Sequence, residues 1–299
     1  AHGKKSASDK RKAVAAAVAA AGALMASGSA IAGSDLATND AVNLWPNGVQ
    51  NPAAGREAVA VGANATASHQ HTIAIGRNAT AKWTNAISIG KDTVASQDHA
   101  LAMATSAKAI GIQSVGIGSY SSASADSAVA LGQNAKAGGE VPAGADKGPG
   151  TAAVAVGLNA NASAANTVAT GKNAAASVDN AIAVGVQSNA SGRAAAALGG
   201  YAAASAERAT AVGAASKASG TASFAGGTSA NAAGVNSVAV GGSMEAAEAA
   251  QAVGNNSIAV GSKSNAQKAS DVAVGHGAKA SGTSAGTNAE GSVNNAGSA

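Results

Sequence analysis

Apolar and polar residues alternate along most of the chain in a short unit that ends in glycine. The unit is apolar–Ala–apolar–Gly, and its last position recurs fifteen times between Gly62 and Gly275, with Ala104 replacing glycine once. Twelve of the fourteen intervals between copies are 14 residues long, and the other two are 25 and 20 residues long. This constant step predicts a repeat protein whose coils all resemble one another.

Two strands and two turns are predicted in each repeat. Val, Ile or Leu stands one and three residues before most of the glycines, an alternation with period two that is typical of a strand. A mostly polar residue and then an Ala stand four and five residues after each glycine, which predicts a second short strand. The glycine and the Asn, Asp or Ser beside it favour tight turns. A repeated strand–turn–strand–turn coil is a β-solenoid.

The sequence also raises the question of which side chains fill the interior. We expect the Val and Ile positions to point inward, opposite the Ala five residues after the glycine. The residue two before the glycine is Ala in 13 of 15 copies, with Ser88 and Gly116 as the others, and we expect this uniform position to contact a neighbouring chain. Two alternatives stay open: the Val and Ile residues face the partner instead, or Ala is simply common in this chain. Either orientation implies association, because so thin a coil buries little surface alone.

Composition and charge narrow the classes of function. Hydrophobic residues make up 46% of the 299 residues, but aromatic residues are only 2% and charged residues 11%, which is unusual for a globular domain. There is no cysteine, which excludes disulfides, thiol catalysis and thiolate metal sites. Residues 1–12 hold five cations and one anion, and the remaining 14 cations and 14 anions cancel. A neutral body behind a basic tail argues against a nucleic-acid partner.

The repeat resembles a known family. The runs AVAVGANATA (58–67), TIAIGRNATA (72–81), AISIGKDTVA (86–95), SVAVG (237–241) and SIAVG (257–261) resemble the head repeats of YadA-like trimeric autotransporter adhesins. The resemblance implies an all-β, left-handed parallel β-roll of about 15 coils, with three chains around a common axis. It also implies a cell-surface location on a Gram-negative outer membrane, and adhesion to host matrix, host cells or other surfaces.

The ends of the chain lie outside the clear repeat, which covers residues 56–282. Residues 1–55 are interpreted as a signal-like tail or a capping segment, with a basic start, an Ala-rich run and a turn-rich stretch around Trp45 and Pro46. Residues 283–299 are interpreted as a degenerate end of the head. No stalk heptads or barrel strands follow, and the first residue is not Met, so we expect a head fragment whose membrane attachment depends on a C-terminal anchor absent from this sequence.

Two insertions interrupt the repeat and are candidates for the binding surface. The segment 138–149 is predicted to be a loop, and the segment 242–255 a short helical turn or an aberrant coil. Four lysines also recur at the polar position after the turn, where they favour either an acidic ligand or simple solubility. The candidate ligand-binding residues are Lys108, Lys136, Lys217, Lys279, Glu140, Asp146, Lys147, Glu245 and Glu248.

No catalytic, cofactor or metal site is predicted. His69 and His71 would share a face on a strand, and His71 and His99 occupy the same position two coils apart with Asn85 between them. No third ligand is fixed near them, and we interpret them as solvated surface histidines. A phosphate-binding Gly-Lys-Ser/Thr pattern and the calcium-binding nonapeptide are both missing.

Three functions remain to be compared. The first is an adhesin head, a homotrimer that binds a host extracellular-matrix protein or a cell-surface glycan or receptor by multivalent, non-catalytic contacts. The second is an ice- or crystal-binding solenoid, which would need a regular Thr or Asn face. The third is a polysaccharide-modifying solenoid enzyme, which would need clustered acids and aromatic residues.

Overall fold

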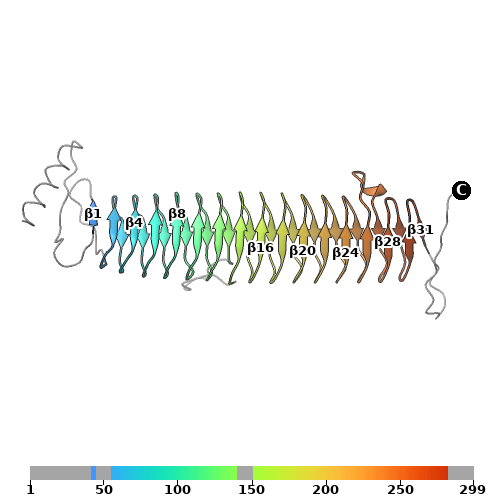
Figure 1. Cartoon of the computed structure of the whole chain (residues 1–299), viewed down its shortest axis with the longest axis horizontal. Coiled ribbons are helices and arrows are strands. Elements are labelled where there is room, and N and C mark those ends of the chain that lie inside the picture. Colours follow the sequence, from blue (N-terminus) through green and yellow to red (C-terminus); the bar gives the residue numbers. More distant parts are fainter. Residues whose placement is uncertain (1–41, 45–54, 140–150, 282–299) are drawn as a thin grey trace, which may run out of the picture. The chain divides into compact units, whose positions relative to one another are not determined.

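The computed structural model describes residues 42–44, 55–139 and 151–281. The chain separates into two compact units, Ala1–Ser121 and Ser122–Ala299. In each unit the chain winds through alternating long and short parallel strands (Figure 1). The predicted all-β parallel solenoid of about 15 turns with a 14-residue period is therefore confirmed. No helix in the described part of the chain is long and apolar enough to cross a membrane.

In the first unit, one long strand of three residues and one short strand of two residues make up each coil. The long strands pair in parallel in the order β1 (Val42–Leu44), β2 (Val59–Val61), β4 (Ile73–Ile75), β6 (Ile87–Ile89), β8 (Leu101–Met103) and β10 (Val115–Ile117). The short strands pair in the order β3 (Thr66–Ala67), β5 (Thr80–Ala81), β7 (Val94–Ala95) and β9 (Lys108–Ala109). Equivalent residues of successive repeats are therefore direct partners across the sheet.

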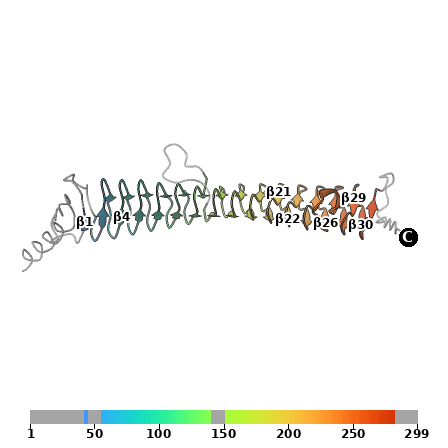
Figure 2. The ribbon, with the colours of Figure 1, turned by 90° about the horizontal axis from the view of Figure 1, so that it is seen from above.

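The second unit repeats this arrangement. Its long strands are β12 (Val129–Leu131), β14 (Val154–Val156), β16 (Val168–Thr170), β18 (Ile182–Val184), β20 (Ala196–Leu198), β22 (Thr210–Val212), β24 (Phe224–Gly226), β26 (Val238–Val240), β28 (Ile258–Val260) and β30 (Val272–Val274). Its short strands are β11 (Ser122–Ala123), β13 (Lys136–Ala137), β15 (Asn161–Ala162), β17 (Ala175–Ala176), β19 (Asn189–Ala190), β21 (Ala203–Ala204), β23 (Lys217–Ala218), β25 (Asn231–Ala232), β27 (Gln251–Ala252), β29 (Asn265–Ala266) and β31 (Lys279–Ala280). Figure 2 shows β21 and β29 in one layer and β22, β26 and β30 in the other.

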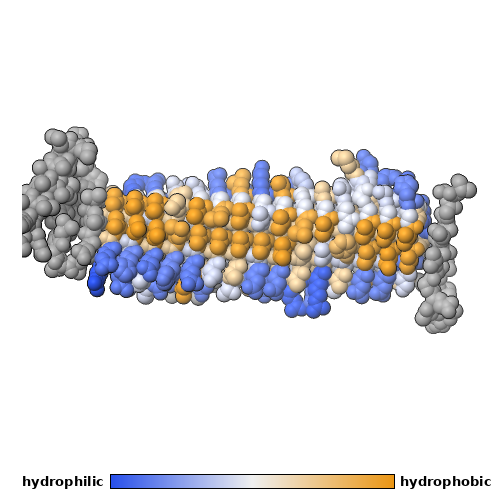
Figure 3. Space-filling view, in the orientation of Figure 1, coloured by the Kyte–Doolittle hydropathy of each residue, from blue (hydrophilic) through white to orange (hydrophobic). Residues whose placement is uncertain are grey.

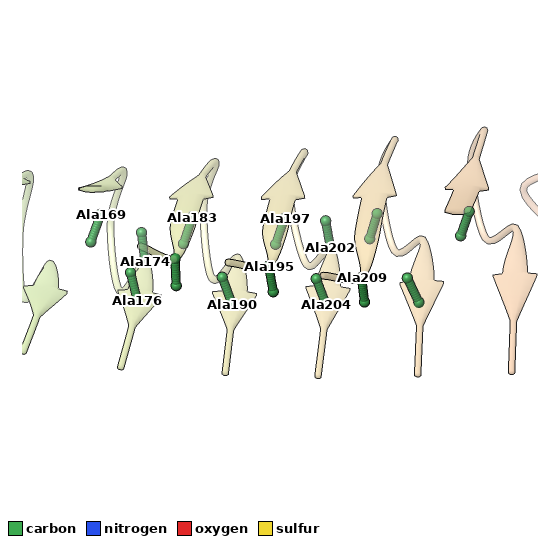
Figure 4. Close-up of a cluster of buried hydrophobic side chains, with 14 of the residues drawn as sticks. Ala169, Ala174, Ala176, Ala183, Ala190, Ala195, Ala197, Ala202, Ala204 and Ala209 are labelled. Carbon is green, nitrogen blue, oxygen red and sulfur yellow. The ribbon is translucent and has the colours of Figure 1, made fainter. Parts of the chain in front are cut away.

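The core between the two layers consists of small side chains, which corrects the expected orientation of the long strands. The Ala two before the glycine is fully buried, as Ala183 and Ala197 show, and the residues on either side of it, such as Ile182 and Val184, point outward and are at least partly exposed. Figure 4 shows the methyl groups of both layers directed into the space between them. The expectation that Val and Ile fill the interior, with this Ala against a neighbouring chain, is wrong, and the opposite orientation is the one observed.

The physical reason for this orientation is the width of the coil. Each coil brings its two strands so close that the interior holds only residues of the size of Ala, Ser or Thr. At Gly116 a methyl group would lie 2.4 Å from the carbonyl oxygen of Lys108 in the opposite strand. Because side chains alternate across a strand, an inward Ala forces the Val and Ile beside it to point outward.

The turns divide each coil into two halves of seven residues. The third residue of each four-residue turn adopts a left-handed conformation, as at Glu57 (φ 55°), Asn64 (φ 58°) and His71 (φ 58°). Asn is frequent at this position because it tolerates that conformation better than most residues. The repeat glycine has a second constraint: at Gly62 (φ +120°) a methyl group would lie 2.8 Å from the backbone of Gly76 in the next coil.

The interval 242–255 contains a one-turn 3-10 helix, η1 (Ala246–Glu248), which is the helical alternative of the two we considered. The chain then re-enters the short-strand layer at β27, which pairs with β25 and β29. The buried Ala of this coil is therefore Ala252 and not Ala246, which stands five residues after Gly241 but is exposed. The constant spacing in the sequence was misleading here, because the insertion falls between the glycine and the short strand.

Candidate binding surfaces

The outer surface of the long strands forms an apolar face, which we define as the residues one and three positions before each repeat glycine. These side chains are at least partly exposed in both units. Figure 3 shows them as an apolar band with polar residues beside it. The most exposed large members are Ile75, Met103, Ile182, Val184, Leu198, Val212, Phe224, Val240, Ile258 and Val274. Contiguous exposed apolar surface on a soluble protein is typical of an interaction site.

The outer surface of the short strands is mainly polar. Thr66 and Thr80 occupy it in the first unit, and Asn161, Asn189 and Asn231 occupy it in the second. Val94 and two alanines interrupt any regular Thr or Asn row. The two layers of each unit therefore present chemically different outer surfaces, one suited to association and one suited to water.

Side-chain ladders connect the coils at the turns. The Asn64 side chain donates to Asn78 at 3.1 Å, and Asn78 in turn donates to the Asp92 carboxylate at 2.6 Å. The hydrogen bond from Asn78, with the nearby cations Lys91 and Arg77, holds the pKa of the Asp92 carboxyl below its ordinary value. In the second unit, Arg193 makes an exposed ion pair with Glu207 at 2.6 Å.

Three of the histidines lie on the turns of the first unit, and each has a different partner. The His71 side chain contacts the Glu57 carboxylate at 2.6 Å, and His99 lies 3.1 Å from the Asn85 amide. His69 does not share a strand face with His71 as expected; both lie in a turn, and the His69 ring stacks on Trp83, with ring centres 5.1 Å apart. Among the described residues, no three His, Cys, Asp or Glu side chains form a group that could hold a metal ion.

The contact between His69 and Trp83 was not predicted from the sequence. Its signal was present, because the two residues are one 14-residue period apart and must therefore lie in neighbouring coils. The interpretation of the histidines as solvated surface side chains therefore missed a ring contact between neighbouring coils.

Comparison with known families identifies the repeat. The family described as YadA head domain repeat matches nine segments, residues 53–79, 84–103, 109–135, 149–174, 179–202, 204–230, 227–243, 248–264 and 252–278. The chain belongs to the YadA head domain repeat family. This family is a non-catalytic adhesin domain of trimeric autotransporters, and its adhesins are trimeric and exposed at the cell surface. No curated protein matches the chain.

The lysines that we proposed as ligand-binding residues are separated on this YadA-type head. Lys108, Lys136, Lys217 and Lys279 each begin a short strand with an exposed side chain. In the second unit their strand partners are uncharged: Lys136 pairs with Ser122 and Asn161, and Lys217 with Ala203 and Asn231. The structure therefore does not gather these three lysines into one cationic site.

Two of the four candidate acids lie in the described part of the head. Glu140, Asp146 and Lys147 lie outside the described residues. Glu245 is exposed beside η1, and Glu248 forms an ion pair with Lys263 at 2.9 Å. Both acids lie within the insertion, so a ligand of this region would meet one exposed acid and one paired acid.

Proposed function

We propose that this chain is the head of a homotrimeric cell-surface adhesin, in which three copies pack through the apolar face around a common axis. The observation that carries the proposal is the orientation of the long strands, which leaves the largest apolar side chains of every coil outside the core. The family supplies the stoichiometry, because its adhesins are trimeric. A left-handed coil is part of the same proposal and rests on the resemblance to that family.

Energetic considerations favour burial of the apolar face in an assembly. Full burial of a Val or Ile side chain is worth about 1.5–3 kcal/mol relative to exposure. These residues are already partly covered by their neighbours, so each contributes roughly half of that on association. The contribution recurs in every coil, and a closed cyclic arrangement would cover the face on all copies equally.

The proposed activity is attachment to host matrix proteins, host cells or other surfaces by multivalent contacts without catalysis. The head would be presented at the cell surface, on the outer membrane. The mixed outer surface of the short strands favours contacts spread over several coils, where many weak contacts add up to a high avidity. The same irregularity disfavours the ice-binding alternative, and the non-catalytic family disfavours the enzyme.

The assembly is tested by the solution mass of the chain, measured by light scattering. The wild type should have the mass of three chains. The variant Asn189→Glu, on the polar outer surface of the short strands, should have the same mass. The double variant Ile182→Glu and Val184→Glu changes β18, the long strand of the same coil. It should not form the trimer, because three copies would bury six carboxylates at the interface. A trimer that survives the double substitution, or a wild type that stays monomeric at every concentration, would contradict the proposed interface.

Attachment is tested with the same proteins on surfaces coated with matrix proteins. Single substitutions of Lys136, Lys217 or Lys279 should change attachment little, and removal of several whole coils should abolish it. A single surface substitution that eliminates attachment without unfolding the head would overturn the distributed mode of binding.

A further inference from the structure

We propose that Lys172 of each copy forms an ion pair with Asp179 of the next copy, and that this contact fixes the register of the chains in the trimer. Lys172 lies in the turn between β16 and β17, and Asp179 lies in the turn between β17 and β18. The proposal rests on the proposed function, because it assumes three copies whose apolar faces surround a common axis. It adds a second contact surface, formed by the turns.

The direction of the long strands decides which turns meet. A cyclic assembly is head to tail, so two different surfaces of neighbouring copies touch. When three long strands surround one axis, the end of each strand lies next to the start of the strand in the neighbouring copy. The turn that follows a long strand, such as that of Lys172, therefore meets a turn that precedes a long strand, such as that of Asp179.

Cyclic symmetry also places the two charges at nearly the same height along the axis. Rotation does not move a residue along the axis, so each residue has the same height in all three copies. Lys172 and Asp179 are seven residues apart, which is half of the 14-residue coil. Because neighbouring coils are about 4.8 Å apart, their heights differ by roughly 2.4 Å. The flexible four-carbon stem of a lysine spans such a difference.

The two charges lack ionic partners in their own chain. Both residues are exposed, and neither makes an ion pair within the part of the chain that the structure describes. The Asp179 carboxylate accepts a hydrogen bond from the Ala165 amide at 3.0 Å, which holds it at the turn. By contrast, Arg193 and Glu207 pair between neighbouring coils of one chain at 2.6 Å. The coil of Lys172 therefore carries opposite, unpaired charges at its two ends.

The side chains around Lys172 also favour contact with another copy. Leu158 and Val186 occupy the equivalent position in the coils before and after it, and they are 37% and 46% exposed. The turns that precede long strands carry small residues in the corresponding coils, such as Ala165 and Gly192. Large apolar side chains can pack closely against such small residues. Their contact would exclude water and salt from the ion pair and so reduce its screening.

The first unit shows the same order of charges independently. Lys91 lies between β6 and β7, and Asp98 follows seven residues later, between β7 and β8. These positions are equivalent to those of Lys172 and Asp179 in the repeat. Lys91 also contacts the Asp92 carboxylate at 3.6 Å, so the pair in the second unit is the clearer one to test.

An ion pair of this kind supplies what the apolar face lacks. The apolar face repeats every 14 residues, so a slip of one chain by one coil brings apolar residues opposite apolar residues again. Register is weakly specified wherever a shifted pairing is almost equivalent. A charge that occurs in only some coils removes this equivalence, because a shifted chain would leave Lys172 without Asp179.

The first test is zero-length carbodiimide coupling of the full wild-type chain, at a concentration where light scattering gives the mass of three chains. Chains with nitrogen-14 and nitrogen-15 are refolded together, and the coupled peptides are identified by mass spectrometry. An amide between Lys172 and Asp179 should join peptides of different isotope content. Asp179→Asn should remove this product. The coupling of Lys263 to Glu248, which are 2.9 Å apart in one chain, is the internal control.

The second test is charge reversal. Lys172→Glu alone and Asp179→Lys alone each place like charges at all three contacts of a trimer. When the two variants are refolded together, Glu at position 172 of one chain can meet Lys at position 179 of the next. Native mass spectrometry should then show mixed trimers in about threefold excess over the random proportion. Asn161→Lys mixed with Asn189→Glu, both on the outer surface of the short strands, should give the random proportion.

A wild-type trimer that yields no Lys172–Asp179 coupling between chains would overturn the proposal. Coupling of Lys172 to an acid of a distant coil, or random mixing of the charge-reversal variants, would overturn it as well. These results leave the proposed trimer standing, because its mass is measured first and separately. A wild type without the mass of three chains would instead overturn both the proposed assembly and this contact.

Discussion

Two adjacent glycines, Gly199 and Gly200, allow a sharp test of how the coils stack. Gly199 is a repeat glycine with φ +140°, and a methyl group there would lie 2.5 Å from the carbonyl oxygen of Gly213 in the next coil. Gly200 has no positive φ, and a methyl group there would lie 3.8 Å from the nearest atom, the carbonyl oxygen of Val186. The same substitution to Ala therefore meets two different environments one residue apart.

The expected magnitudes follow from these two environments. A φ near that of Gly199 costs a side-chain-bearing residue about 1–3 kcal/mol. Separating the coils to relieve the overlap also weakens the 2.8 Å hydrogen bond from the Gly213 amide to the Leu198 carbonyl, a loss of about 1 kcal/mol. Gly199→Ala should thus destabilise the head by about 3 kcal/mol. Gly200→Ala should stabilise it by roughly 0.4–1 kcal/mol, because Ala restricts the unfolded chain.

The assay is urea unfolding followed by far-ultraviolet circular dichroism, with amide hydrogen exchange at Gly213 as a local probe. Long repeat arrays can unfold in parts, so the local probe shows whether the loss is confined to neighbouring coils. Gly199→Ala should lower the midpoint and accelerate exchange at Gly213, and Gly200→Ala should do neither. Equal midpoints for the two variants would refute the explanation that backbone contact between coils requires glycine.

Three further predictions concern the core, the exceptional turn and the Asn ladder. Ala197→Val should destabilise the head by about 1–3 kcal/mol by overpacking the interior, whereas Ala196→Val, which points outward, should stay within about 0.5 kcal/mol of the wild type in urea unfolding. Ala104→Gly should raise the urea midpoint, with a gain of about 1 kcal/mol, because Ala104 holds φ 91° where the other copies have glycine. Asn78→Ala should raise the pKa of Asp92 toward its ordinary value of 3.8 in a carboxyl NMR titration. Because the lowered pKa stabilises the fold above that value and the benefit is lost as pH falls through the folded pKa, this variant should lose less stability on acidification than the wild type.

The sequence predicted the periodic features well, because each of them repeats. The 14-residue step, the strand before the glycine and the strand after it all follow from residues that recur in every coil, and the parallel pairing was implied by the family resemblance. Glycine was predicted at a turn with positive φ, and every repeat glycine has one. A single copy would not have been sufficient, since a three-residue strand carries almost no signal alone.

The orientation of the strands could not be decided by hydrophobicity alone. Alternation places Val and Ile on one side and Ala on the other, but it does not say which side faces inward. The expectation that the larger apolar residues are buried failed because the distance between a long strand and the opposite short strand, as at Gly116 and Lys108, leaves no room for them. Ala246 shows a related error, in which spacing was counted across an insertion that shifts the strand to Gln251–Ala252.

The small core and the apolar face together have a thermodynamic consequence. A buried Ala contributes about 0.8 kcal/mol through its methyl group, whereas a Val or Ile beside it is worth about 1.5–3 kcal/mol once fully covered. In the coil of Ala183, the outward neighbours Ile182 and Val184 are still partly exposed. Their complete burial would therefore add more free energy of stabilisation than the buried methyl group of Ala183 contributes. An isolated chain would leave that contribution unused in every coil. If three copies cover one another's apolar faces as proposed, association completes the hydrophobic burial that a single chain only begins, and the stability of the head rises with its concentration.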